Sequence, residues 1–389
     1  MPPPLNPPSR LTSNPPSHAP SDTLRRPAVR YLPNAVRHAS LLLCCATLPG
    51  LVHGAEHAAC GDDSRQSGGA ASLRVDNDVF GAQDQGYSNG ILMMLTSSDL
   101  SDGSRRSDLR DGRACHWPIT RWLARHLGVL RPAGSGQQNL TASFAQAIFT
   151  PDDREQEELI PHDRPYAAAL LLGLGYNARS GNRLQTTLLQ VGIVGPSARG
   201  RQAQNEIHEL VGDRPFRGWD NQLGDEGVFR LLHERLQRHA PKGRWQPGGD
   251  WRWDGVSHWG ASVGNLLTHL GAGGELRFGQ RLPDDFGTAP VRPAGEYTGR
   301  PPPADAGFRA HAFASVDARW VLRDISLDGN AFRASHHVDK QPFVADLGYG
   351  LALTHGPWKV VFARFHRTRE FKGQRNRPVF GSVSVSRAF

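Results

Sequence analysis

The sequence predicts an all-β fold: a twelve-stranded antiparallel transmembrane β-barrel with a short helix in an extracellular loop. Segments of alternating apolar and polar residues recur throughout residues 70–389. Most are close to the roughly 9–11 residues with which a tilted strand crosses a bilayer. The mean hydropathy is −0.48. Outside the N-terminal region no apolar run approaches the roughly 20 residues of a spanning helix, which excludes a polytopic helical protein.

The first part of the chain is predicted to lie outside the barrel. Residues 1–34 carry ten of the 29 prolines and no hydrophobic periodicity, so we expect a disordered leader, for which a misplaced start codon is one explanation. Residues 35–54 combine a basic residue, a short apolar stretch and small residues, a pattern typical of a signal peptide. A short membrane anchor is the alternative. Residues 55–69 would begin the mature chain.

Cysteine content and charge exclude two classes of protein. Four cysteines are too few for a disulfide-built scaffold. Cys60 and Cys115 would remain after signal cleavage, either as one disulfide or as two free thiols. The net charge is +8, but the basic residues do not cluster into an arm, so nucleic-acid binding is not predicted. Nothing in the sequence indicates an oligomeric state.

The predicted strands are clearest at the C-terminus, where Val383, Val385 and Phe389 alternate with serines. A chain that ends on a strand with a final Phe is typical of outer-membrane barrels. A soluble β-sandwich is the alternative, but it predicts turns every 8–12 residues or so, and this chain has several long loops. The candidate strands are 70–78, 87–97, 138–150, 165–177, 183–195, 225–237, 251–264, 268–281, 308–322, 341–354, 357–370 and 379–389.

One segment within the barrel region is predicted to be helical. Residues 200–212 are good helix formers between Gly200 and Gly212, which predicts a helix with a glycine stop. Gln204 and His208 are four residues apart and therefore share a face of this helix.

Strand parity predicts that four separated segments meet at one end of the barrel. If the first strand starts in the periplasm, its end at Asp76-Asn77-Asp78 and the start of the second strand at Tyr87-Ser88-Asn89 share the outer rim. The loops 151–164 and 196–224 face the same side. The same parity places the insertion 98–137 in the periplasm, where turns are usually short, and predicts no function for it.

These segments offer an imidazole, carboxylates, carboxamides and a hydroxyl. Histidine is the usual general base near neutral pH, and Asp and Asn oxygens suit Ca²⁺. A cation beside a His base can polarise an ester and hold its oxyanion while water attacks. Gly260–Gly264 matches the G-x-S-x-G nucleophile pattern around Ser262, but it lies in a strand pattern without the helices that give this motif meaning.

Taken together, the motifs resemble the lipid A 3′-O-deacylase family of Gram-negative outer membranes. The resemblance covers nearly all of 70–389, in order. The matching segments are Val75–Asp78, Gly86–Gly90, Gln146–Pro151, Asp163–Ala167, Gly192–Pro196, Gln204–His208, Gly218–Leu223, Ser262–Asn265, Leu327–Asn330 and the ending at Phe389.

The resemblance implies Ca²⁺-dependent hydrolysis that removes the 3′-linked acyloxyacyl chain of lipid A, or lipopolysaccharide, in the outer membrane. It implies that His208 is the base that activates water and that Gln204 supports it. Asn77 and Asp78 match an essential Asn-Asp pair, with Asp78 in the Ca²⁺ environment. Ser88 stands where the family has Thr or Ser.

Position 214 departs from the family pattern. Some members have a functional Glu two residues after the helix-ending glycine, and here that position is Arg214, with Asp213 beside it. The acidic role is therefore unassigned.

Two other functions remain open from the residues. A non-enzymatic outer-membrane pore predicts ion conductance and no need for His208. A barrel phospholipase that cuts glycerophospholipids through a Ser-His pair would need Ser262 as nucleophile.

Overall fold

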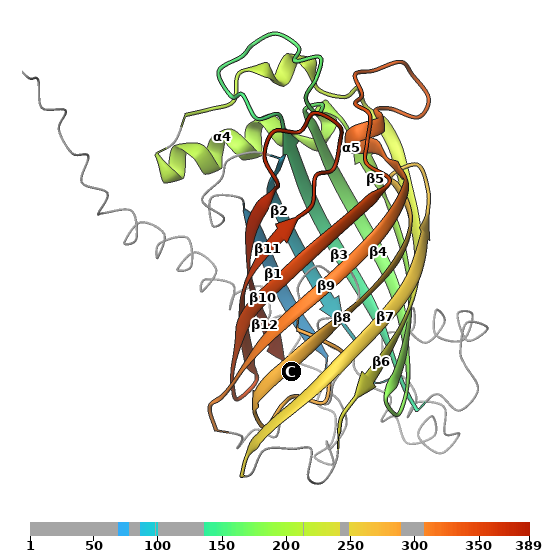
Figure 1. The fold of residues 1–389 in the computed structure, drawn as a ribbon, viewed down its shortest axis with the longest axis vertical. Helices are drawn as coiled ribbons and strands as arrows, with labels where there is room; N and C mark the ends of the chain where they lie inside the picture. Colours follow the sequence, from blue (N-terminus) through green and yellow to red (C-terminus); the bar gives the residue numbers. More distant parts are fainter. Residues whose placement is uncertain are drawn as a thin grey trace, which may run out of the picture. The chain divides into compact units, whose positions relative to one another are not determined.

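The structure is a computed structural model that describes residues 69–77, 86–97, 99, 136–212, 214–241, 249–288 and 307–389. Its twelve strands form a closed barrel in which each strand pairs with the next in sequence and β1 pairs with β12 (Figure 1). All pairs are antiparallel. The predicted all-β, twelve-stranded barrel is confirmed. The predictions for the leader, the signal peptide and the insertion fall on residues outside the described ranges.

The strand bounds differ from the predicted ones by at most three residues. The strands are β1 (Ala70–Asn77), β2 (Gly86–Thr96), β3 (Gln137–Thr150), β4 (Ala167–Ser180), β5 (Arg183–Val194), β6 (Glu226–His239), β7 (Trp251–Val263), β8 (Leu267–Gln280), β9 (Arg309–Asp324), β10 (Phe343–His355), β11 (Trp358–Arg367) and β12 (Val379–Ala388).

The predicted helix is also confirmed. It is α4 (Gly200–Val211), and it ends at Gly212, whose φ of 73° is the left-handed conformation that glycine adopts without strain. The structure adds three short helices that the sequence did not predict, η6 (Pro196–Ala198), η7 (Gly218–Asn221) and α5 (Ile325–Asp328). No helix in the described part of the chain is long and apolar enough to cross a bilayer.

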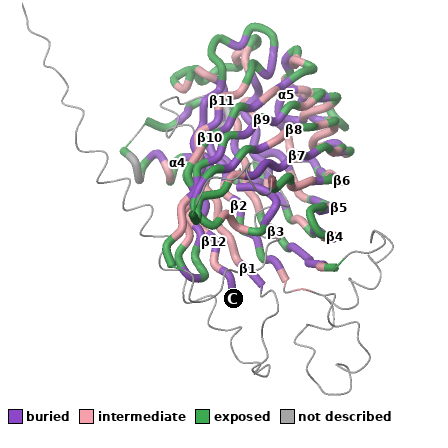
Figure 2. Tube along the Cα trace, turned by 60° about the horizontal axis from the view of Figure 1, so that its bottom comes forward, coloured by how far each residue is buried: buried purple, intermediate pink, exposed green. Residues whose placement is uncertain are grey.

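The strands alternate between an outward-facing and a lumen-facing side. On β12 the serines 382, 384 and 386 are buried in the lumen, whereas Val383 and Val385 face outward, as the alternation predicts. Figure 2 shows buried and exposed residues alternating along the strands. The outward side carries exposed apolar residues such as Leu95, Leu172, Val191, Leu231, Leu276, Val316, Leu322 and Leu347.

The barrel has two different ends. Helices α4 and α5 lie at one end, which we call the site end, and β12 runs towards the opposite end (Figure 1). The loops 151–166, 195–225, 325–342 and 368–378 all connect strands at the site end. The convergence that strand parity predicts for the loops 151–164 and 196–224 is therefore confirmed.

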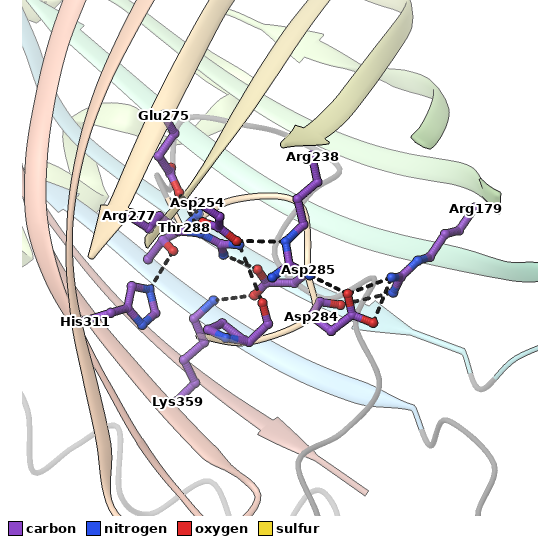
Figure 3. A network of polar contacts seen from close by, with 11 residues as sticks. Arg179, Arg238, Asp254, Glu275, Arg277, Asp284, Asp285, Thr288, His311 and Lys359 are labelled. Atoms are coloured by element: carbon purple, nitrogen blue, oxygen red, sulfur yellow. Dashed lines mark hydrogen bonds and ion pairs between the residues drawn. The ribbon is translucent and has the colours of Figure 1, made fainter. Parts of the chain in front are cut away.

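At the opposite end the turn that follows β8 folds into the lumen. Asp285 ion-pairs with Arg277 and Lys359 (Figure 3). Phe286 is fully buried in a hydrophobic cluster with Leu184, Leu236 and Val256. Asp284 pairs with Arg179 at 2.8 Å. Burial alone would raise the pKa of Asp285, but Lys359 and Arg277 hold it well below its usual range. The turn is thus fixed as an ionised plug.

Candidate functional site

Helix α4 lies on the outward face of the barrel wall at the site end. Its first residue, Gly200, packs so closely on β4 that an added Cβ would collide with the Ala168 Cβ. Ala168 has the same strand parity as Leu172, which is exposed on the outward-facing side. The Gln146 side chain of β3 donates a hydrogen bond of 2.8 Å to the Ala198 carbonyl just before the helix. These contacts fix the start of the helix against β3 and β4.

One face of α4 is turned to the wall. Gln204 and His208 follow Gly200 by one and two turns and are buried, whereas Asn205, Glu206 and Glu209 are exposed. The helix lies across the site end, towards the side on which β2 lies (Figure 1). Eight residues of helix span about 12 Å, or two to three strands at about 4.8 Å each. Gln204 and His208 thus lie beyond the start of the helix, which is fixed against β3 and β4.

The imidazole of His208 is held by a backbone carbonyl. Its Nδ1 lies 2.6 Å from the carbonyl oxygen of Arg214. The ring of Phe216 meets it edge-on, with centroids 5.6 Å apart. When Nδ1 carries the proton and donates to this carbonyl, the lone pair is on Nε2. This is the arrangement that a general base requires.

The loop that supplies this carbonyl is anchored by an aromatic cluster. Tyr166 packs against Phe216 and Trp219, at centroid distances of 6.2 and 5.1 Å. Burial raises the pKa of Tyr166 to about 12, so its phenol stays neutral. Trp219 is fully buried and also contacts Gly200. The cluster therefore ties the returning loop to the start of α4, which sets the position of the carbonyl that orients His208.

The wall contributes a row of outward-facing residues on neighbouring strands, which we call the outer rung: Asn77, Asn89 and Ile148. The register pairs Asn77 of β1 with Asn89 of β2, and Asn89 with Ile148 of β3. All three lie on the outward-facing side. Asn89 has the same parity on β2 as the exposed Met93, and Asn77 and Ile148 are its register partners. Asn77 is thus at the predicted end of β1, on the outer side of the wall.

A β-bulge interrupts β2 beside the outer rung. Tyr87 pairs with Phe149 and Asn89 pairs with Ile148, so Ser88 is the extra residue between them. Bulges bend a strand and re-aim its side chains, and they are frequent next to active sites. The predicted role of the Ser88 side chain is untested because only its backbone is described. Asp78 lies outside the described residues.

Two carboxamides of the site are buried with unsatisfied atoms. Gln204 is 1% exposed, and neither its Oε1 nor its Nε2 has a hydrogen-bond partner. Asn89 is 4% exposed, and its Oδ1 is also without a partner. A buried polar atom left unpaired costs about 1–3 kcal/mol, so such atoms are rare unless a ligand or water pairs with them. The sequence placed Asn89 in a motif but did not assign it to the site.

The described residues of the site provide only part of what a hard cation needs: an amide oxygen is present, but a cluster of carboxylates is not. Among the described residues, no group of three or more His, Cys, Asp and Glu could hold a metal ion. Arg214 does not replace the missing acid, because its side chain is exposed and pairs with Glu155 at 3.2 Å. The unpaired Oδ1 of Asn89 is the type of oxygen that Ca²⁺ accepts. Asp78 would be the carboxylate neighbour by sequence.

Ser262 lies in a different place. Its strand parity directs it into the lumen, where it is buried, and its hydroxyl donates a hydrogen bond of 2.7 Å to the Leu267 carbonyl. His258 lies four residues earlier on β7 and also faces the lumen. Its imidazole is held between Glu234 at 2.8 Å and Asp317 at 2.6 Å. Ser262 therefore has a structural role in this arrangement and no histidine base among its hydrogen-bond partners in the described range.

Comparison with protein families matches residues 41–389 to the family described as outer membrane protein LpxR. Among solved structures, LpxR from Salmonella typhimurium is similar with a TM-score of 0.62 and 18% identity, over 82% of this chain and 100% of that chain. The β domain of the Bordetella autotransporter BrkA gives a TM-score of 0.36 and 11% identity, over 83% of this chain and 99% of its own. No curated protein sequence matches the chain.

Proposed function

Because the chain belongs to the family of the outer membrane protein LpxR, we propose that it is a lipid A deacylase that uses His208 as its base. The family is the one that the sequence motifs predict. In our proposal the enzyme hydrolyses the ester that links the 3′ acyloxyacyl chain to lipid A. The observation that carries the proposal is a buried imidazole, oriented through Nδ1 by the Arg214 carbonyl, on a helix that covers the outer wall of the barrel.

The position of the site suits a substrate that resides in a membrane. The outer wall is apolar, and α4 covers it at one end, so an acyl chain can lie along the wall while its ester reaches the helix. The longer loops of bacterial barrels face the cell exterior, and we assign the site end to that side. Lipid A fills the outer leaflet there.

In this mechanism His208 Nε2 removes a proton from the attacking water, while Nδ1 continues to donate to the Arg214 carbonyl. The hydroxide adds to the ester carbonyl and forms a tetrahedral intermediate. His208 then returns the proton to the sugar oxygen as the acyl–oxygen bond breaks. A base in this role contributes about 10²–10⁴ in rate.

The unpaired carboxamides would act on the ester. The Nε2 of Gln204 is a donor that can hydrogen-bond the ester oxygen as it gains charge, a contact that strengthens in the transition state. We further propose that Asp78 and the Oδ1 of Asn89 hold Ca²⁺, with Asn77 and Ser88 positioned beside them. When bound, the ion would supply additional stabilisation of the oxyanion.

The paired charged residues in the lumen argue against the alternative that the protein is an open pore. The Asp285 plug and its ion pairs occupy the end opposite the site, and the lumen holds further charged residues paired with one another, such as Arg319 and Arg367 with Asp346. We expect no steady conductance from the chain in planar bilayers. Conductance that persists in His208→Ala would favour the pore.

The test is mass spectrometry of lipid A from cells that express the chain, with His208→Ala as the comparison. We expect loss of one acyloxyacyl unit with the intact chain only. Asn205→Ala, an exposed change on the opposite face of the same helix, is the matched control and should deacylate normally. Loss of the acyl unit in the His208→Ala cells as well would remove His208 from the mechanism.

A further inference from the structure

The loop between β11 and β12 exposes positive charge only. Within residues 368–378, which we call the cationic loop, the exposed ionisable side chains are Arg369, Lys372, Arg375 and Arg377. Its one acidic residue, Glu370, is buried. The loop therefore presents four cations to solvent at the site end, and no anion of its own offsets them.

A buried spine keeps this loop in one conformation. Glu370 ion-pairs with Arg164 at 3.0 Å and with Arg367 at 3.1 Å. Burial alone would raise the pKa of Glu370, but Arg164 and Arg367 hold it below its usual range. Phe371 is buried in a hydrophobic cluster, and the Gln374 side chain accepts a hydrogen bond of 2.7 Å from the Glu370 backbone. The cations project from a backbone that is already ordered.

Neighbouring acids neutralise little of this charge. Lys372 meets Asp339 at 3.4 Å, in a pair that is exposed on both sides and therefore weak. The half-buried Asp152 acts on Arg375 through its charge. Arg375 and Arg377 have no ion-pair partner among the described residues. Two arginines are thus available to an anion from solution.

The cationic loop is next to the outer rung. It leads into β12, which pairs with β1, and Gly381 of β12 is the register partner of Asn77. Arg377 precedes Gly381 by four residues, about 13 Å along an extended chain, and neighbouring strands are about 4.8 Å apart. The loop therefore lies one strand to the side of Asn77 and further out towards the site end.

We propose that the cationic loop binds the phosphate groups of the glycolipid whose ester is presented to His208. Arginine suits this task because its planar guanidinium matches phosphate with two parallel hydrogen bonds. The ordered spine reduces the conformational entropy that binding would otherwise remove. The inference rests on the proposed function and adds to it the part of the substrate that is recognised, and the residues that recognise it.

The experiment measures binding without turnover. The full chain carrying His208→Ala, in detergent micelles, is titrated with bisphosphorylated lipid A and with lipid A whose phosphates have been removed. The loop variant adds Lys372→Gln, Arg375→Gln and Arg377→Gln. The matched control adds Arg183→Gln, Arg252→Gln and Arg281→Gln, three exposed arginines at the opposite end that lower the charge by the same amount.

We expect the loop variant to lose about tenfold or more in affinity for bisphosphorylated lipid A, since it loses three charged contacts. Its affinity for the dephosphorylated lipid should stay unchanged, and its binding should depend less steeply on salt. The control should bind both lipids as the His208→Ala chain does. Equal affinities in all three proteins, or an equal loss in the control, would overturn the inference.

Turnover separates this inference from the proposed function. With the intact His208, the loop variant should raise KM more than it lowers kcat, because the lost contacts are made equally before and during the reaction. A chain that never hydrolyses lipid A but shows the binding difference contradicts the proposed function alone. A chain that hydrolyses lipid A with an unchanged KM in the loop variant contradicts the inference alone.

Discussion

Two groups of buried polar side chains in this barrel differ in how well they are paired. In the plug at the end opposite the site, the charged groups of Arg238, Asp254, Arg277, Asp285 and Lys359 all have ionic partners (Figure 3). At the site end, Gln204 of α4 and Asn89 of the outer wall are equally buried and keep three atoms unpaired. The charged groups of the plug find their partners within the chain. The unpaired atoms of Gln204 and Asn89 can find partners only in a bound ligand or water.

This difference separates a structural from a functional use of buried polarity. A paired network in a low-dielectric interior specifies one arrangement, and losing a partner is strongly destabilising. Unpaired buried groups lower stability and are kept where activity requires them. The comparison therefore predicts opposite outcomes for substitutions at the two places.

The largest expected effect is in the plug. Asp285→Ala removes the carboxylate that Arg277 and Lys359 share. Arg277 keeps Asp254, but Lys359 loses its ion-pair partner among the described residues, so the free energy of unfolding should fall by about 3–5 kcal/mol. The measurement is denaturant unfolding of the purified chain in detergent. Asp284→Ala is the matched control: this carboxylate is 51% exposed, so its loss should cost about 1 kcal/mol or less. Equal losses in the two variants would contradict the pairing argument.

Gln204→Met sharpens the comparison at the site. It replaces two unpaired polar atoms with an apolar chain of similar volume, so the unfolding free energy should rise by about 1 kcal/mol. Hydrolysis of lipid A should fall by about tenfold or more, since a donor to the oxyanion is lost. The exposed Gln202→Met on the same helix should change neither. A stable, fully active Gln204→Met chain would remove Gln204 from the site.

The smallest expected effect is a pH dependence. Burial, and then Asp163, raise the pKa of Asp152 from 3.8 to about 6. The folded chain therefore holds this proton to a higher pH than the unfolded chain does, and stability is lost as the pH rises from about 4 through 6. Asp152→Asn should be more stable than the parent at pH 7.5 and equal to it below pH 4. Asp153→Asn, its exposed neighbour, is the control, and an identical gain there would contradict the assignment.

The sequence was most informative where local pattern decides structure. Strand alternation placed the lumen serines of β12, and the glycine pair around 200–212 placed α4. Periodicity also put Gln204 and His208 on one face. These features depend on neighbouring residues in the chain, and the hydrophobic effect sorts them without long-range information.

The features that the sequence did not reveal depend on distant contacts or on backbone atoms. Lys359 and Asp285 meet across the lumen although 74 residues separate them. The oxygen that orients His208 belongs to the backbone of Arg214, so the identity of residue 214 carries no signal for it. Asn89 was visible in the sequence only as part of a motif, because its place on the outer side of the wall follows from the strand register.

The most direct test compares two histidines. His208→Ala should reduce the rate of lipid A hydrolysis by about 10²–10⁴ with little change in stability. His258→Ala leaves Glu234 and Asp317 facing each other in the lumen, and should lower the unfolding free energy by about 3–5 kcal/mol while each folded molecule keeps its activity. The hydrolysis rate per folded molecule and the free energy of unfolding, measured for both variants, distinguish the catalytic histidine from the structural one. An active His208→Ala chain, or an inactive but fully folded His258→Ala chain, would contradict the account.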